Sequence, residues 1–169
     1  MSLNNVQSTD DCLPPVVGPK PRILILGSFP GKESLKRRQY FGNPRNQFWR
    51  IMGDLFGAAP DADYAYRAGI LTKNRVCLWD VVGSCSREGS ADAEIRNVKF
   101  NDIVQFISQY PTIRVIFFDG KSAEKLFRKN MRKEKLPIPC FALPSTSPAY
   151  AAMSYEEKLK RWSVIKGWL

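Results

Sequence analysis

Four continuously apolar segments, rich in Val, Ile, Leu and Phe, are spaced along the chain between stretches with a helical period. Continuous apolarity without alternation is typical of parallel strands that are covered on both faces. The predicted strands cover 22–26, 76–82, 115–118 and 139–143. Helical spacing predicts helices over 47–56, 101–110, 122–129 and 155–168, with Asn101 as the N-cap of the second and Ser122 at the start of the third.

Strands and helices alternate in this pattern, which predicts an α/β fold. The expected architecture is a three-layer α/β/α sandwich with a central four-stranded, mostly parallel sheet. Open parallel sheets bind ligands at the carboxyl ends of their strands, so we expect the chemistry in the loops that follow them. Residues 1–20 hold few large apolar side chains and predict a flexible N-terminal tail, followed by one domain over 21–169.

The charge balance adds a class of partner to this picture. Lys and Arg number 26 against 16 acidic residues, a formal net charge of +10. Such an excess attracts polyanions, which makes nucleic acid the first partner to consider; an ordinary basic soluble domain is the alternative.

The cysteines and the termini exclude several other classes. The sequence has four Cys, none in a CxxC pair, and no His, so we expect no metal site and no cofactor. Cys77 and Cys140 lie in apolar runs, where free thiols pack as small core side chains, which favours a reducing, cytoplasmic location. No signal peptide or membrane span is indicated, and we expect a monomer.

Two loops at predicted strand ends carry the candidate chemistry. The first, 27–49, is too long for a simple connection and too aromatic for disorder, and Gly31 lets its backbone approach a ligand. The second, 143–162, places three hydroxyl side chains between prolines, where they can hydrogen-bond a phosphate. The alternative for the second loop is a Pro-rich turn in which Ser154 caps the last helix.

Several motifs in these loops and between them occur in a recognisable order. They are GSFPG, YFGNPRNQFWRIM, LWDVVGSCSREGSADAEIRN, FFDG and LPSTSPA. In this combination the chain, from about residue 22 to 169, resembles the uracil-DNA glycosylase superfamily, and most closely its hypoxanthine-DNA glycosylase branch. The resemblance implies an enzyme that removes a deaminated base from DNA by hydrolysing its N-glycosidic bond.

The chain departs from the superfamily pattern at the residue that should orient the attacking water. The superfamily has Asn or Asp there, whereas this chain has Phe29, which cannot hydrogen-bond a water. The resembling branch has an Asn at Asn46, so we expect Asn46 to be catalytic together with Ser28 of the GSFPG motif. The alternative is that Asn46 only caps the following helix.

The resemblance also assigns the residues that hold the substrate. Ser147 is expected to hold a phosphate, Tyr150 to wedge into the base stack unless it packs as an ordinary tyrosine, and Phe29, Tyr40 and Phe41 to wall the extruded base. Further candidate contacts to DNA are Pro30, Gly31, Ser84, Arg87, Arg96, Ser145, Thr146 and Pro148.

An acid interrupts the second predicted strand at Asp80. By resemblance this position reads the edge of the expelled base, and a carboxylate, which only accepts hydrogen bonds, would select a base that presents an N–H donor. Hypoxanthine and uracil both do so. The structural alternative is that amides near Ser84 and Ser86 satisfy Asp80.

We therefore expect a DNA glycosylase that removes a deaminated base, hypoxanthine first and uracil next. Three alternatives stay open: a uracil or mismatch-specific glycosylase, a module of the same fold that binds damaged DNA after losing catalysis, and an unrelated enzyme acting on small nucleotides. Cleavage of lesion-containing DNA distinguishes them.

Overall fold

A parallel sheet of four strands, in the order β3-β2-β6-β7, forms the centre of the molecule. The computed structural model describes residues 9–131 and 134–169. The strands are β2 (Ile23–Gly27), β3 (Val76–Asp80), β6 (Val115–Asp119) and β7 (Cys140–Leu143). All three pairings are parallel, so the predicted strands and the predicted parallel sheet are confirmed.

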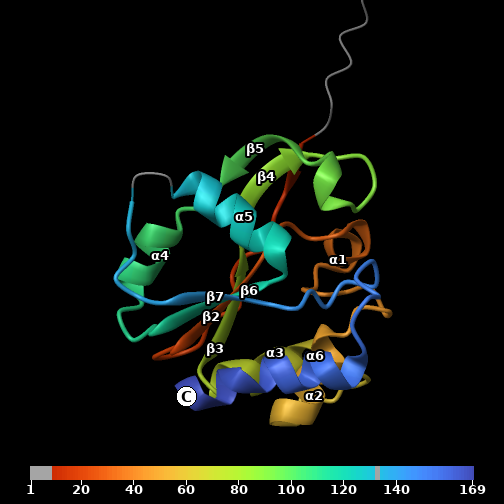
Figure 1. Ribbon diagram of the computed structural model, residues 1–169, viewed down its shortest axis with the longest axis vertical. Helices are drawn as coiled ribbons and strands as arrows, with labels where there is room; N and C mark the ends of the chain where they lie inside the picture. Colours follow the sequence, from red (N-terminus) through yellow and green to blue (C-terminus); the bar gives the residue numbers. More distant parts are fainter. Residues whose placement is uncertain (1–8, 132–133) are drawn as a thin grey trace, which may run out of the picture.

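Helices cover both faces of this sheet (Figure 1). One face is covered by α2 (Phe48–Phe56), α3 (Tyr64–Lys73), α6 (Tyr155–Trp162) and the 3₁₀ helix η2 (Ser163–Trp168), and the other by α4 (Ile103–Gln109) and α5 (Lys121–Asn130). Side chains of β2 alternate between the two resulting cores: Ile23 and Ile25 face one, Leu24 and Leu26 the other. The expected three-layer sandwich is therefore confirmed.

The starts and ends of three helices differ from the expectation. Asp102, not Asn101, caps α4: the Asp102 carboxylate accepts from the Gln105 amide over 2.9 Å, and the Asn101 side-chain amide donates to the Asp80 carbonyl over 2.8 Å. Ser122 lies inside α5, whose N-cap is Gly120 at φ 90°. The last helix ends at Trp162 and continues as η2.

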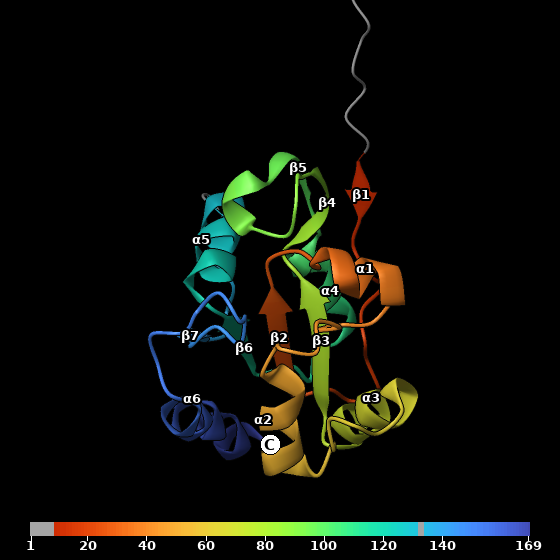
Figure 2. The ribbon, with the colours of Figure 1, turned by 90° about the vertical axis from the view of Figure 1, so that its right-hand side faces the viewer.

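A second, antiparallel sheet of three strands lies beside the first (Figure 2). The predicted strand over 76–82 ends at Asp80, and the chain then enters β4 (Val82–Ser86), which pairs with β1 (Asp10–Asp11) and β5 (Arg96–Phe100). These strands are short and polar, so no apolar run marks them. Two short helical segments, α1 (Lys32–Arg37) and η1 (Asp92–Glu94), were also not predicted, nor was α3.

The segment expected to be a flexible tail packs against the domain from Asp10 onward. Leu13 is only 2% exposed, and the backbone of Val16 bridges that of Leu78 in both directions at 2.9 Å. Apolar residues between prolines supply the contacts that the overall polar composition concealed. Residues 1–8 of the expected tail lie outside the described residues. Among the described helices, none has the length and apolarity to cross a membrane.

Candidate active site

The two loops that carry the sequence motifs meet at the carboxyl end of the parallel sheet. The Gln47 amide, at the start of α2, donates to the Thr146 carbonyl over 3.0 Å. Strand β2 leads into the first loop at Gly27, and β7 leads into the second at Leu143. The expected convergence of the loops is therefore confirmed, at the sheet edge where parallel sheets bind ligands.

Asp119, the last residue of β6, fastens the second loop to the sheet. Its carboxylate accepts from the Thr146 amide at 2.8 Å and from the Thr146 hydroxyl at 2.7 Å. Thr146 is 0% exposed, so its expected contact with DNA is wrong for the side chain, which is used inside the protein. Burial raises the pKa of Asp119 to about 6, against the lowering effect of the two Thr146 hydrogen bonds. Asp119 was not among the predicted site residues, although an acid that ends an apolar strand indicates a buried carboxylate that needs partners.

Beyond Thr146 the loop forms a compact tip. The Ser147 amide donates to the Ser145 hydroxyl, and the Ala149 amide to the Ser147 hydroxyl, each over 3.2 Å. Pro148 and Tyr150 project into solvent, with Tyr150 38% exposed. This geometry leaves Tyr150 accessible, as a wedge requires.

Lys158 of α6 binds the backbone of this tip through its buried ammonium group. The residue is 2% exposed, and its ammonium donates to the Tyr150 carbonyl at 2.7 Å and to the Gln47 side-chain oxygen at 2.9 Å. A buried lysine needs such acceptors, because burial without them is costly. Lys158 thereby joins both loops. No local pattern indicated this role, since a lysine on an amphipathic helix is normally exposed.

Asp80, the last residue of β3, is buried beside the start of the first loop, and its carboxyl group is not satisfied by hydrogen bonds in the described part of the chain. It is 4% exposed, and a Cβ added at Gly27 would lie 2.6 Å from Oδ1, so a larger residue at Gly27 would displace the Asp80 carboxyl group. Within residues 9–131 and 134–169, Oδ2 is buried without a hydrogen-bond partner. The alternative that amides near Ser84 and Ser86 satisfy this oxygen is therefore wrong. Burial, reinforced by Asp92 and Asp119 and opposed by Arg87, raises the pKa of Asp80 to about 8.

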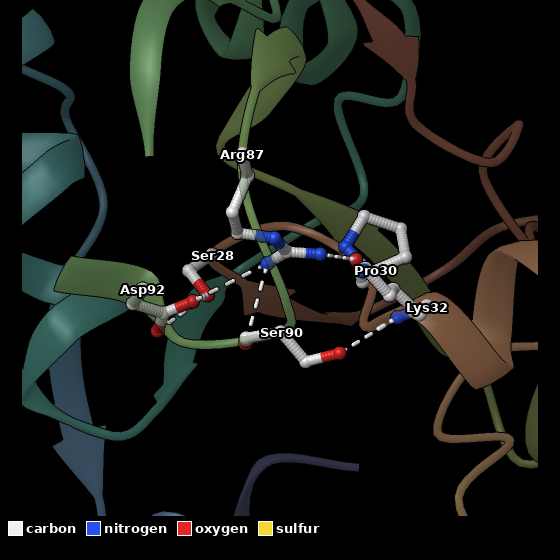
Figure 3. A network of polar contacts seen from close by, with 6 residues as sticks. All are labelled: Ser28, Pro30, Lys32, Arg87, Ser90 and Asp92. Carbon is white, nitrogen blue, oxygen red and sulfur yellow. Dashed lines mark hydrogen bonds and ion pairs between the residues drawn. The ribbon is translucent and has the colours of Figure 1, made fainter. Parts of the chain in front are cut away.

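A polar network joins the first loop to the segment between β4 and β5 (Figure 3). The Ser28 hydroxyl donates to the Asp92 carboxylate, 2.8 Å from both oxygens. Arg87 lies 3.9 Å from the same carboxylate and donates to the Pro30 carbonyl. The Arg87 side chain is only 2% exposed and lies over the Phe29 ring, so its expected DNA contact is wrong: its charge holds two loops together.

The three aromatic residues expected to wall the base have different surroundings. Tyr40 is a core residue, 4% exposed, whose hydroxyl donates to the Leu13 carbonyl at 3.1 Å; its role as a wall of the base stays a prediction. Phe29 is 6% exposed and packs in a small cluster below Arg87. Phe41 is half-buried and stacks on Phe48 with ring centroids 3.8 Å apart. Among the three, Phe41 is the most accessible to a ligand.

Asn46 lies at the start of α2 beside a surface cavity of about 350 Å³. Its Oδ1 accepts from the Phe48 amide, the first of α2, at 2.8 Å, so the side chain supports the start of the helix from the residue before the N-cap Gln47. The cavity is lined by Pro44, Arg45, Asn46, Gln47, Arg50 and Pro60. The half-exposed Asn46 side chain thus combines this support of the helix with a position next to two cationic side chains.

The remaining predicted contacts lie around this centre. Gly31 precedes α1, and a Cβ on it would be 3.5 Å from the Ser90 hydroxyl. Ser84 lies in the small sheet between β1 and β5. Arg96 begins β5 and donates to the neighbouring Ala93 carbonyl at 2.7 Å. Across the described part of the chain, no group of three or more His, Cys, Asp or Glu side chains is arranged to hold a metal ion.

Comparison with known proteins places these motifs in a family. A family model described as the Uracil DNA glycosylase superfamily matches residues 14–168. A hypoxanthine DNA glycosylase of Methanosarcina acetivorans is 36% identical over 156 residues, covering 90% of this chain and 94% of the relative. A second protein of that name, from Methanosarcina barkeri, is 36% identical over 111 residues, covering 65% of this chain and 70% of its own length.

A solved structure agrees with the sequence relatives. The NMR structure of a candidate uracil DNA glycosylase from Methanosarcina acetivorans superposes with a TM-score of 0.80 at 34% identity, covering 94% of this chain and 96% of that one. The resemblance drawn from the motifs is confirmed by these matches.

Proposed function

Because the chain belongs to the uracil DNA glycosylase superfamily, and is therefore a DNA N-glycosylase, we propose that it removes hypoxanthine from DNA as its principal substrate. Two relatives that share 36% identity with it carry the name hypoxanthine DNA glycosylase. The net charge of +10 suits a polyanionic substrate.

The observation that carries a deaminated base as the substrate is the carboxyl group of Asp80, which is buried and unpartnered among the described residues. With a pKa of about 8 the side chain retains its proton at neutral pH, and it then offers one O–H donor and one acceptor oxygen. The N1–H and C6=O edge of hypoxanthine offers the complementary acceptor and donor pair. Two hydrogen bonds can thus form side by side, and the orphaned Oδ2 gains the partner it lacks. The preference for hypoxanthine over uracil, whose N3–H and C4=O edge offers the same pair, rests on the two relatives.

Aromatic and cationic residues of the first loop and of α2 add groups that suit a flipped nucleotide. Phe41 provides a half-buried ring against which a base can stack, and stacking of this kind contributes about 1–3 kcal/mol. Arg45 and Arg50 bring positive charge to the cavity beside Asn46, where the strand backbone would pass. Tyr150 fills the gap left in the duplex.

Hydrolysis in this site separates base and sugar without a cofactor. The bond between C1′ and the base nitrogen breaks, and its electron pair leaves with the base. Water adds to C1′, so that over the reaction one water proton goes to the base and the hydroxyl to the sugar. We assign to Asn46 the positioning of this water, through the amide group that also supports the start of α2.

The test is excision of single lesions from labelled oligonucleotides, followed as alkali-cleavable abasic sites. We expect hypoxanthine to be released faster than uracil or xanthine from matched duplexes, and Asn46→Ala to lower the single-turnover rate by about 10²-fold or more. As a matched control, Asn43→Ala changes a neighbouring asparagine whose Oδ1 caps only the local turn. Binding without any abasic product contradicts the proposal, as does preferential release of uracil.

A further inference from the structure

Asp92, an acid bound to the first loop through Ser28, has no role in the reaction described so far. Its side chain is 34% exposed, in contrast to the buried Asp80. The Ser28 hydroxyl lies 2.8 Å from both carboxylate oxygens and fixes their direction. Ser28, which binds Asp92, directly follows Gly27, the glycine that packs against Asp80. The two acids are close enough for the charge of Asp92 to raise the pKa of Asp80.

The segment that presents Asp92 is held firmly against the first loop. Arg87 donates to the Pro30 carbonyl and, over 3.4 Å, to the Ser90 carbonyl. The Lys32 amide donates to the Ser90 hydroxyl over 3.0 Å (Figure 3). The carboxylate is therefore preorganised, which is the condition under which a fixed charge lowers a reaction barrier.

The sign of this charge opposes DNA binding. An exposed carboxylate beside a bound strand repels its phosphates, in a protein that otherwise carries a net charge of +10. Arg87, 3.9 Å away, compensates only part of the charge, because the Arg87 guanidinium also serves two backbone carbonyls. A group that weakens substrate binding is useful if it stabilises the transition state more than the bound substrate.

We propose that Asp92 is a catalytic residue, whose carboxylate, aimed by Ser28, stabilises the positive charge that spreads over C1′ and the ring oxygen of the sugar as the base departs. This inference rests on the proposed glycosylase function. The carboxylate forms no covalent bond: the glycosidic electron pair leaves with the base, and water then supplies the hydroxyl to C1′ and the proton to the base. Asn46 positions the water, and Asp92 acts on the cation.

The experiment measures excision of hypoxanthine and DNA affinity separately. Single-turnover rates are measured with saturating protein, and Kd is measured on a duplex that carries a stable abasic-site analogue. Asp92→Asn is expected to lower the rate by about 10²-fold, as does removal of one preorganised electrostatic group in other enzymes. The same variant should bind the duplex as tightly as the parent or more tightly, because a repulsive charge is lost.

Two further variants fix the interpretation. Ser28→Ala keeps the carboxylate but removes its orienting donor, and should lower the rate by about tenfold. Glu88→Gln removes the same charge from an exposed side chain of the same segment, and should excise within about fivefold of the parent.

Three results overturn the inference. If Asp92→Asn is as active as Glu88→Gln, the carboxylate does not act on the sugar. If Asp92→Asn loses rate, affinity and thermal stability together, Asp92 only holds the loop. If the parent itself releases no base, the proposed function fails first, an outcome distinct from an active parent with an active Asp92→Asn.

Discussion

Two acids, Asp80 and Asp119, end the strands that flank β2, and their surroundings give them opposite tasks. Asp119 accepts two hydrogen bonds from Thr146 and holds the second loop to the sheet. Asp80 is 4% exposed, and its Oδ2 has no partner in the described residues. One carboxyl group is used by the protein, and the other is left for a ligand.

The difference shows what separates a structural acid from a binding one. Both carboxyl groups have raised pKa values, about 8 for Asp80 and about 6 for Asp119, with burial as the first cause in each case. The hydrogen bonds from Thr146 favour the charged form of Asp119 and hold its pKa lower. Satisfaction of the hydrogen-bonding groups, rather than burial, therefore distinguishes the two sites.

The largest expected effect comes from removing the open acid. Asp80→Ala should lower excision of hypoxanthine by about 10³-fold or more, because the edge of the base then enters a buried site without its partners. Single-turnover kinetics measure the loss. Asp61→Ala, at an exposed acid, serves as the control. An Asp80→Ala enzyme of nearly parental rate would remove the basis for treating the two acids differently.

The next effect is on stability and differs in size between the two positions. The folded-state pKa of Asp80, about 8, lies above its ordinary 3.8, so folding is favoured below the lower value and this contribution is lost as the pH rises through the higher one. Asp80→Asn has no charge to bury, so between pH 3.8 and about 8 its free energy of unfolding should rise relative to that of the parent by up to about 1.4 kcal/mol per pH unit.

Asp119→Asn should gain less on the parent, because the folded-state pKa of Asp119, about 6, makes the corresponding pH interval shorter and because an amide cannot accept both the Thr146 amide and hydroxyl protons in the present geometry. Chemical unfolding of both variants and the parent at pH 5 and pH 8 compares the two changes. Equal behaviour of the variants would show that the two carboxyl groups are not distinct.

A smaller effect tests the attachment of the second loop. Thr146→Val keeps the side-chain volume but removes the hydroxyl that donates to Asp119, and should cost about 1–2 kcal/mol of folding free energy together with part of the excision rate. Thr112→Val removes a hydroxyl that donates to the Pro21 carbonyl, at the opposite end of the sheet. The control should lose stability but retain excision; a similar loss of rate in both variants would contradict a specific role of the loop.

The smallest effect concerns the tip of the same loop. Lys158→Met leaves the Tyr150 carbonyl and the Gln47 side-chain oxygen without their donor, at a cost of about 1 kcal/mol. Because a loose tip is a poor wedge, excision from duplex DNA should fall more than excision from single-stranded DNA. The ratio of the two rates is the measurement, and an unchanged ratio would show that Lys158 does not support Tyr150 in duplex opening.

The fold could be predicted from the sequence wherever burial is two-sided. The continuous apolar runs of β2 and β6 identify the central sheet, and the motifs identify the loops at its carboxyl end. The small sheet could not be predicted, because β4 and β5 are short and polar, and their pairing partner β1 has only two residues. Leu13 is a core residue within a segment whose composition indicated a tail.

The site was predicted less completely than the fold. Motifs identified Asp80 and the meeting of the two loops, but spacing cannot show which polar groups are already used. Arg87 and Thr146 were expected at the DNA, and the protein uses both for internal contacts. Asp92 and Lys158 gain importance only through partners distant in sequence, Ser28 and Gln47, which no local pattern indicates.

The most direct test of the central claim is the pH dependence of hypoxanthine excision by the parent and by Asp80→Asn. If the protonated Asp80 reads the base, the parental rate falls as the pH rises through about 8, whereas the Asn variant, which presents a permanent donor and acceptor, stays active and loses this fall. An inactive Asp80→Asn, or identical profiles for both enzymes, would contradict the account.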